Sequence, residues 1–130
     1  MKPINIIYIV LPLVLLTGCS SKGTLQPTQL AKAAKVSEIH CYNIDIKQVE
    51  TRIEQYLKKC FKYDSIKKGN IGKGRRISLS EGSTYQYSAE LRENTNGCKT
   101  ESKMYGIDNE WKDVLAQSNL AVFENAYSCP

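Results

Sequence analysis

The chain has 130 residues, of which 42% are apolar and 24% are charged, and its formal net charge is +5 at neutral pH. This length leaves room for one small domain and excludes a chain of several average-sized domains. The basic excess is mild, and it is weak evidence for any particular partner.

The first nineteen residues have the layout of a secretory leader. Lys2 precedes thirteen uncharged, mostly apolar residues, 4–16, and the tetrad Leu16-Thr17-Gly18-Cys19 follows them. A permanent membrane helix needs about 20 apolar residues, so this run is too short, and Pro12 would also interrupt a stable helix. We therefore interpret residues 1–18 as a signal peptide.

The tetrad resembles the lipobox of bacterial lipoproteins. The resemblance implies cleavage before Cys19, attachment of diacylglycerol to its thiol and several acyl chains, which hold a protein stably at a bilayer. Ser20 stands where inner-membrane lipoproteins of enterobacteria carry Asp, which implies the outer membrane, with the domain facing the periplasm. The alternative is an ordinary secreted protein in which Cys19 is merely the first thiol. The resemblance says nothing about residues 20–130.

Export limits the partners. Removal of residues 1–18 leaves 112 residues, and the net charge falls from +5 to +4 because Lys2 is the only charged residue removed. Nucleic acid is not expected outside the cytoplasm. The basic charge instead favours anionic lipid headgroups, lipopolysaccharide or an acidic protein surface.

Four cysteines remain once Cys19 carries lipid: Cys41, Cys60, Cys98 and Cys129. An even number in a small exported chain predicts two disulfides. A metal site fits poorly, because the chain has no CxxC pair and only one histidine, His40. We expect neither a metal nor another cofactor.

Residues 19–40 are rich in small and polar residues and predict a lipidated flexible tether, followed by a folded domain over residues 41–130. A tether of this kind reaches roughly 20 to 25 Å. Apolar residues then recur at spacings of three and four from Ile46 to Cys60, which predicts an amphipathic helix with Asp45 as its N-cap. Residues 62–76 are basic and Gly-rich and predict a mobile loop. Their Gly-Lys pair lacks the spacing and hydroxyl of a phosphate-binding Walker loop.

Alternating apolar residues predict strands over residues 77–80, 84–92 and 98–105, joined as an antiparallel β-meander by a turn at residues 94–97. The third strand alternates weakly, so we expect it near a sheet edge. A second helix begins at Asp108 or Asn109, and it ends either near Ser118 or almost at Cys129. The expected fold class is α+β: an amphipathic helix, a three-stranded antiparallel meander, a second C-terminal helix and two disulfides.

Helix length constrains the disulfide pairing. A helix over residues 45–60 is roughly 22 Å long, which excludes a Cys41–Cys60 bond, because bonded cysteines have Cα atoms within about 7 Å. Following chain direction through the meander favours Cys60–Cys98 and Cys41–Cys129. A second helix that runs to the end of the chain would instead bring Cys129 to Cys60.

The sequence has few groups for catalysis. His40 is expected to be structural or exposed, the carboxylates are scattered beside Lys and Arg, and no Ser lies in a G-x-S-x-G elbow. We therefore expect a non-enzymatic lipoprotein that contacts the bilayer through Cys19 and an envelope protein through its domain, as an accessory subunit of an envelope assembly. Eight tyrosines fit this view, because Tyr is enriched at interfaces, although Tyr85 and Tyr87 are expected to cover a core.

The alternative function is that of a periplasmic inhibitor or ligand-binding lipoprotein. Residues Gly82-Ser83-Thr84-Tyr85 loosely resemble a stretch of membrane-bound lysozyme inhibitors. Those inhibitors are all-β proteins, and the predicted helix over residues 45–61 departs from their fold.

Overall fold

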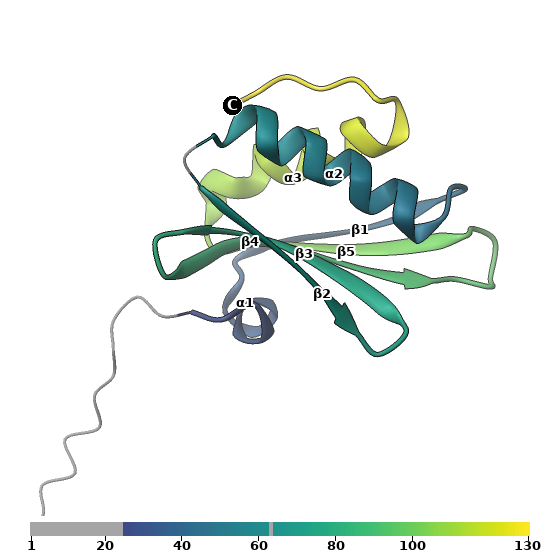
Figure 1. Cartoon of the computed structure of the whole chain (residues 1–130), viewed down its shortest axis with the longest axis horizontal. Helices are drawn as coiled ribbons and strands as arrows, with labels where there is room; N and C mark the ends of the chain where they lie inside the picture. Colours follow the sequence, from purple (N-terminus) through teal and green to yellow (C-terminus); the bar gives the residue numbers. More distant parts are fainter. Residues whose placement is uncertain (1–24, 63) are drawn as a thin grey trace, which may run out of the picture.

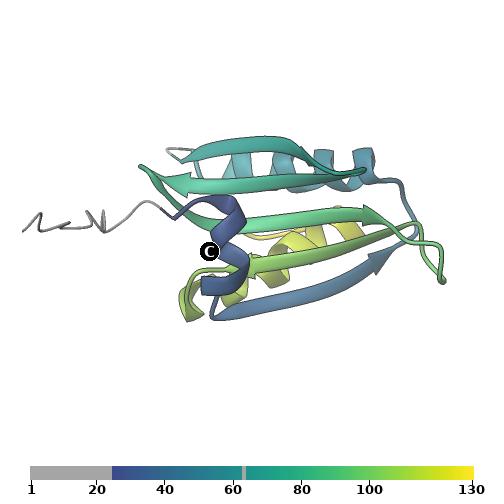
Figure 2. The ribbon, with the colours of Figure 1, turned by 90° about the horizontal axis from the view of Figure 1, so that it is seen from below.

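A five-stranded antiparallel sheet lies between one short helix on one face and two longer helices on the other (Figures 1 and 2). The computed structural model describes residues 25–62 and 64–130. The elements in chain order are α1 (Pro27–Ala33), β1 (Val36–Tyr42), α2 (Ile46–Cys60), β2 (Ser65–Ile71), β3 (Gly74–Glu81), β4 (Thr84–Glu93), β5 (Thr100–Gly106), the 3-10 turn η1 (Asn109–Trp111) and α3 (Lys112–Phe123). The strand order is β1-β5-β4-β3-β2.

The α+β class and the two disulfides are confirmed. The predicted first helix is also confirmed: α2 begins after Asp45, whose carboxylate accepts a hydrogen bond of 2.8 Å from the Gln48 backbone N–H. The predicted three-stranded meander corresponds to β3, β4 and β5, which are only part of a larger sheet. Both missing strands lie in segments that the sequence predicted as irregular.

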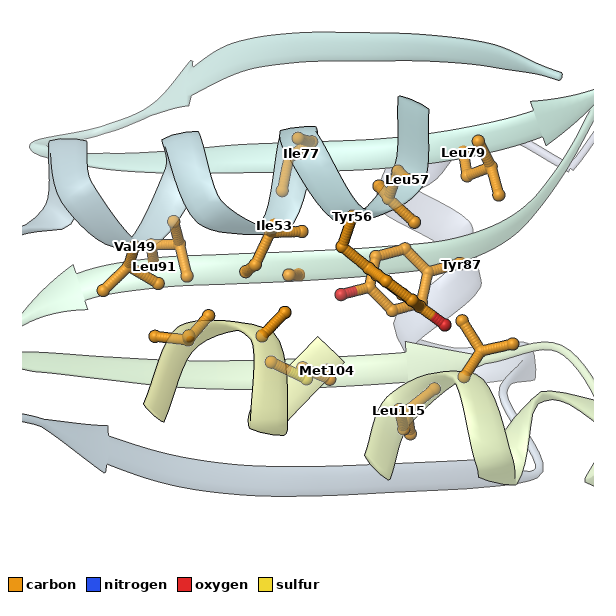
Figure 3. Close-up of a cluster of buried hydrophobic side chains, with 14 of the residues drawn as sticks. Val49, Ile53, Tyr56, Leu57, Ile77, Leu79, Tyr87, Leu91, Met104 and Leu115 are labelled. Atoms are coloured by element: carbon orange, nitrogen blue, oxygen red, sulfur yellow. The ribbon is translucent and has the colours of Figure 1, made fainter. Parts of the chain in front are cut away.

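The main core lies between the sheet and the helices α2 and α3 (Figure 3). One face of α2 buries Val49, Ile53, Tyr56 and Leu57. These side chains pack over apolar residues from three inner strands, with α3 adding a further layer; the residues concerned are Ile77, Leu79, Tyr87, Ala89, Leu91, Met104, Val114, Leu115, Ala121 and Val122. Burial of this apolar surface drives folding of the domain.

Residues 26–40, expected to belong to the tether, are part of the folded unit. They form α1 and most of β1, so the folded domain begins before residue 41. Leu30 is fully buried against the face of the sheet opposite α2 and α3, which we call the second face. The Tyr85 N–H donates a 3.1 Å hydrogen bond to the Leu25 carbonyl. The sequence pattern does not reveal β1 because its helix-facing positions include the polar residues Glu38 and His40. Residues 19–24 lie outside the described residues.

The predicted basic loop contains the edge strand β2. Its Lys67, Lys68 and Gly69 have low strand propensity, but β2 pairs with β3 along its whole length. Lysines on an edge strand also discourage pairing with other chains. The turn to β3 uses Gly72 at φ +59°, in the left-handed region that favours glycine.

The expectation that residues 98–105 lie at a sheet edge is wrong. β5 is an inner strand, because β1 pairs with its outer side from Val36 opposite Gly106 to Tyr42 opposite Thr100. Its alternation is weak because the core face carries Thr100, Ser102 and Gly106 beside Met104. A Cβ on Gly106 would lie 2.6 Å from the Cβ of Trp111, so this position is kept small by close packing.

The favoured disulfide pairing is wrong. The bonds are Cys41–Cys98, with Cα atoms 5.7 Å apart, and Cys60–Cys129, with Cα atoms 5.2 Å apart. The unpredicted strand β2 reverses the direction of every later element, so the loop before β5 lies beside Cys41 rather than Cys60 (Figure 1). The exclusion of a Cys41–Cys60 bond is confirmed.

The second helix ends between the two predicted positions. α3 continues beyond Ser118 and ends at Phe123, and its C-cap is Glu124. The last seven residues then run back along α2 to bring Cys129 to Cys60, at the opposite end of the domain (Figure 1).

Candidate interaction surface

The Cys41–Cys98 bond marks the end of the domain where β1 ends, α2 begins and α3 ends (Figure 1). The segment from Tyr42 to Ile44 connects β1 to α2 at this end. Its position is fixed by hydrogen bonds to α3 and β5.

Three hydrogen bonds hold this segment and its neighbours. The Tyr42 hydroxyl donates to Oδ1 of Asn119 on α3 at 2.8 Å. The Thr100 hydroxyl of β5 donates to the Ile44 carbonyl at 2.7 Å. Nη1 of Arg52 on α2 donates to the carbonyl of Val122 at 2.5 Å. The β1–α2 connection is therefore tied to the sheet and to α3, and α2 is tied to the end of α3.

The hydrogen bond of Tyr42 is stable against ionisation. Burial, and secondarily the negative charge of Glu38, raises the pKa of the Tyr42 phenol well above its ordinary value. The hydroxyl therefore stays protonated at physiological pH and continues to donate to Asn119.

A small cavity of about 160 Å³ opens at this fixed end, and Phe123 lies at its edge. Phe123 is 69% exposed, and Leu120, three residues earlier on the same helix, is 36% exposed. Residues at i and i+3 lie on the same side of a helix. We call this the Phe123 surface; it comprises Leu120 and Phe123 together with the residues that line the cavity, which are Cys41, Tyr42, Asn43, Ile44, Arg52, Val122 and Phe123.

One other large apolar side chain is exposed in the described part of the chain. Ile39 on β1 is 66% exposed. It alternates with the helix-facing residues of β1 and therefore lies on the second face of the sheet. Ile39 does not line the cavity of about 160 Å³, whereas Phe123 does.

The aromatic residues at the other end of the domain pack against one another. Tyr56 makes edge-to-face contacts with Phe61 and Tyr127, at centroid distances of 6.2 and 5.1 Å. Phe61 stacks on Trp111 at 5.6 Å. We call Tyr56, Phe61, Trp111 and Tyr127 the aromatic cluster. The prediction that Tyr87 covers a core is confirmed, because its side chain is fully buried.

The residues singled out in the sequence have the following places. Cys19 lies outside the described residues. Nε2 of His40 lies 2.8 Å from a carboxylate oxygen of Glu38 on the same strand. Gly82, at φ +62°, is in the β3–β4 turn, and Tyr85 lies on β4. The four disulfide cysteines lie in two pairs at opposite ends of the domain.

Within residues 25–62 and 64–130, no group of three His, Cys, Asp or Glu side chains is placed to hold a metal ion. In the same ranges, no helix has the length and apolar character needed to cross a membrane.

Sequence reasoning missed the Phe123 surface, although a signal was present. Residues 120–123 read Leu-Ala-Val-Phe, four apolar residues in succession. A helix that packs on one side buries a single stripe, so four in a row cannot all face the core. Ala121 and Val122 are buried, and Leu120 and Phe123 are left outside.

Comparison with known proteins gives no relative: no protein family, no curated protein and no solved structure matches this chain.

Proposed function

We propose that this protein is a non-enzymatic lipoprotein, anchored by Cys19 to the periplasmic side of the outer membrane, that binds another envelope protein through the Phe123 surface. The observation that carries the proposal is the exposure of Phe123 at the edge of a cavity whose walls are held by hydrogen bonds and a disulfide. An exposed aromatic beside a pocket is typical of protein interfaces.

The fixed geometry favours tight contact. Binding costs free energy when loops and side chains must first become ordered, and a surface that is already ordered avoids much of this cost. The cavity volume of about 160 Å³ is close to the roughly 150 Å³ of an engineered cavity that holds one benzene molecule. It suits one aromatic or branched aliphatic side chain of the partner, packed beside Phe123.

The absence of enzymatic activity is part of the proposal, and the ion pairs support it. Three partly buried carboxylates are paired with cations: Glu50 with Arg75 at 2.7 Å, Glu54 with Lys58 at 2.7 Å, and Glu90 with Arg92 at 3.0 Å. Hydrogen bonds from Lys58 and Lys68 lower the pKa of Glu54. Carboxylates of this kind remain ionised and are poorly suited to act as acids at neutral pH.

The anchor is tested by fractionation of cells that express the chain or its Cys19→Ser variant. The chain should be found in the outer membrane and should incorporate labelled palmitate. The variant should carry no label and should be released from the membrane. Equal labelling of both chains would contradict the assignment of Cys19.

The protein contact is tested by crosslinking and affinity capture from envelopes. Phe123→Ser should remove a specific partner band. Ile39→Ser is the matched control, because Ile39 has nearly the same exposed fraction but lies on the opposite face. The proposal expects Ile39→Ser to retain the partner. Equal capture by both variants, or no specific band with the native chain, would contradict it.

A further inference from the structure

A second cavity, of about 300 Å³, is lined by residues of α1 and of the β2–β3 hairpin. Helix α1 lies on the face of the sheet opposite α2 and α3 (Figure 2). We call this cavity the α1 cavity. The residues that matter for its chemistry are Thr28, Lys67, Gly69, Asn70, Arg76 and Ser78. Gly69 has no side chain, and the Asn70 side chain accepts from Arg75, which pairs with Glu50 of α2 on the other face. The remaining side chains carry basic or hydroxyl groups, which offer hydrogen-bond donors.

The charge around the α1 cavity is basic. In the register of the sheet, Arg76 lies opposite Glu90, and Glu90 lies opposite Lys103. The carboxylate of Glu90 is 3.1 Å from Arg76 and 3.0 Å from Arg92. Glu101 lies opposite Arg92 on the same face, but the wall of the cavity carries two cations, Lys67 and Arg76, and no acidic residue. The cavity wall therefore has a positive excess.

One hydrogen-bond donor of the Arg76 side chain has no acceptor among the described residues. Nη2 of Arg76 donates to Glu90, but its Nε is buried and has no hydrogen-bond partner among the described residues. A buried donor without a partner is costly. A bound anion that accepts from Nε itself would remove this cost, and Arg is well suited to phosphate because of its planar fork.

The α1 cavity also lies close to the proposed anchor. Gln26 is part of its wall and is only seven residues after Cys19, a stretch of at most about 25 Å when fully extended. Residues 20–37 contain Lys22, Lys32 and Lys35 and no acidic residue. Basic groups held this near a membrane are attracted to anionic lipid.

We propose that the α1 cavity binds the phosphate group of an anionic phospholipid in the membrane that holds the anchor. The second face of the sheet then lies on the bilayer, and α3, in the opposite layer (Figure 1), keeps the Phe123 surface available to its partner. This inference relies on the anchoring part of the proposed function but not on the protein contact. It is tested without the lipid anchor, so that the two can fail separately.

The test uses the chain from residue 19 with Cys19→Ser, sedimented with vesicles of phosphatidylcholine alone or mixed with phosphatidylglycerol. The unlipidated chain should bind the mixed vesicles and not the phosphatidylcholine vesicles. Equal sedimentation with both would overturn the proposal, as would no sedimentation with either.

A pair of substitutions at Gly69 tests whether the α1 cavity itself binds the lipid. A Cβ at Gly69 meets no atom within 4 Å, and Gly69 lies opposite Arg76, so both variants can be accommodated. Gly69→Glu should lower the partition coefficient about fivefold or more, because each basic charge near an anionic surface contributes about that factor. Gly69→Gln, of the same shape but uncharged, should bind as the native chain does. Equal binding by the two variants would overturn the proposal.

A pair of lysines separates the α1 cavity from general attraction by net charge. Lys67→Gln and Lys47→Gln each remove one charge, but Lys47 lies on α2, on the other side of the sheet. We expect about a fivefold loss for Lys67→Gln and little change for Lys47→Gln. Equal losses would show attraction by net charge alone and overturn the site.

The final arm distinguishes a lipid from free phosphate. Inorganic phosphate is titrated into the Cys19→Ser chain while the backbone amide resonances of Gly69 and Asn70 are followed by NMR. Phospholipid as the ligand predicts shifts with the mixed vesicles that exceed those with phosphate at equal phosphate concentration. Shifts with inorganic phosphate, without vesicle binding, would overturn the lipid assignment.

Discussion

The aromatic side chains at the two ends of the domain differ in their contacts and in their exposure to solvent. At the Cys60–Cys129 end the four rings of the aromatic cluster contact one another, and Lys59 lies 5.3 Å from the centre of the Tyr127 ring. At the Cys41–Cys98 end Phe123 projects into solvent beside a cavity. Each end has a disulfide, so the exposure of Phe123 is not explained by the lack of a covalent crosslink at its end of the domain.

On the proposed function, the Cys60–Cys129 end stabilises the fold and the Cys41–Cys98 end makes the protein contact. Aromatic pairs add about 0.5 to 1.5 kcal/mol beyond the area they bury, so the aromatic cluster stabilises the fold. A side chain that is 69% exposed contributes little to folding. The following predictions separate the two ends, beginning with the largest expected effect.

Removal of either disulfide should destabilise the domain by about 4 kcal/mol in the chain-entropy model, because the bonds close similar loops with sequence separations of 57 and 69 residues. Urea unfolding of the Cys41→Ala/Cys98→Ala and Cys60→Ala/Cys129→Ala variants measures this. Only the first pair should also weaken partner capture, since Cys41 lines the cavity. Equal loss of capture at matched folded fractions would contradict the distinction between the ends.

Tyr56→Ala should lower the free energy of unfolding by about 3 kcal/mol, because it removes a fully buried ring from the centre of the aromatic cluster. Tyr56→Phe is the matched control. The Tyr56 hydroxyl is buried without a hydrogen-bond partner among the described residues, and burial raises its pKa. Its removal should therefore cost less than about 1 kcal/mol. A large cost for Tyr56→Phe would show a partner for the hydroxyl.

Phe123→Ser should change the free energy of unfolding by less than about 0.5 kcal/mol, as expected for an exposed position. Chemical unfolding of this variant beside Phe61→Ser gives the comparison, because Phe61 stacks on Trp111 and its loss should be clearly destabilising. A similar loss for both would mean that Phe123 supports the fold and that its exposure has no further purpose.

The smallest expected effect concerns pH. Hydrogen bonds from Lys58 and Lys68 hold the pKa of Glu54 below its ordinary value of 4.5. A carboxylate with a lowered folded-state pKa stabilises the fold above its ordinary pKa, and this contribution is lost as the pH falls through the lowered value. Glu54→Gln should therefore reduce the melting temperature near neutral pH, and its difference from the native chain should shrink in acid. A constant difference would contradict this linkage.

The sequence was sufficient where local pattern and tertiary structure agree. Spacing and capping predicted α2 from Asp45 onward, and alternation predicted β4. The edge strands were missed because each is stabilised by its neighbour rather than by its own apolar pattern: Glu38 and His40 interrupt β1, and the lysines interrupt β2. Omitting β2 alone reversed the chain direction and produced the wrong disulfide pairing.

The candidate surfaces were predictable only in part. The run Leu120–Phe123 signals that some apolar side chains cannot be buried, but the cavity beside them depends on contacts such as Tyr42 with Asn119, which are 77 positions apart in sequence. The α1 cavity depends on α1, a helix of seven residues that is held on the sheet by its two buried residues, Pro27 and Leu30. Neither arrangement follows from local periodicity.

The most direct measurement of the central claim is site-specific photocrosslinking in living cells. A photoreactive phenylalanine analogue is placed at position 123, and in a separate chain at the exposed Lys62, beside the aromatic cluster. The account predicts a discrete crosslinked envelope protein from position 123 and none from position 62. A discrete product from position 62 with none from position 123 would contradict the assignment of the contact to the Phe123 surface.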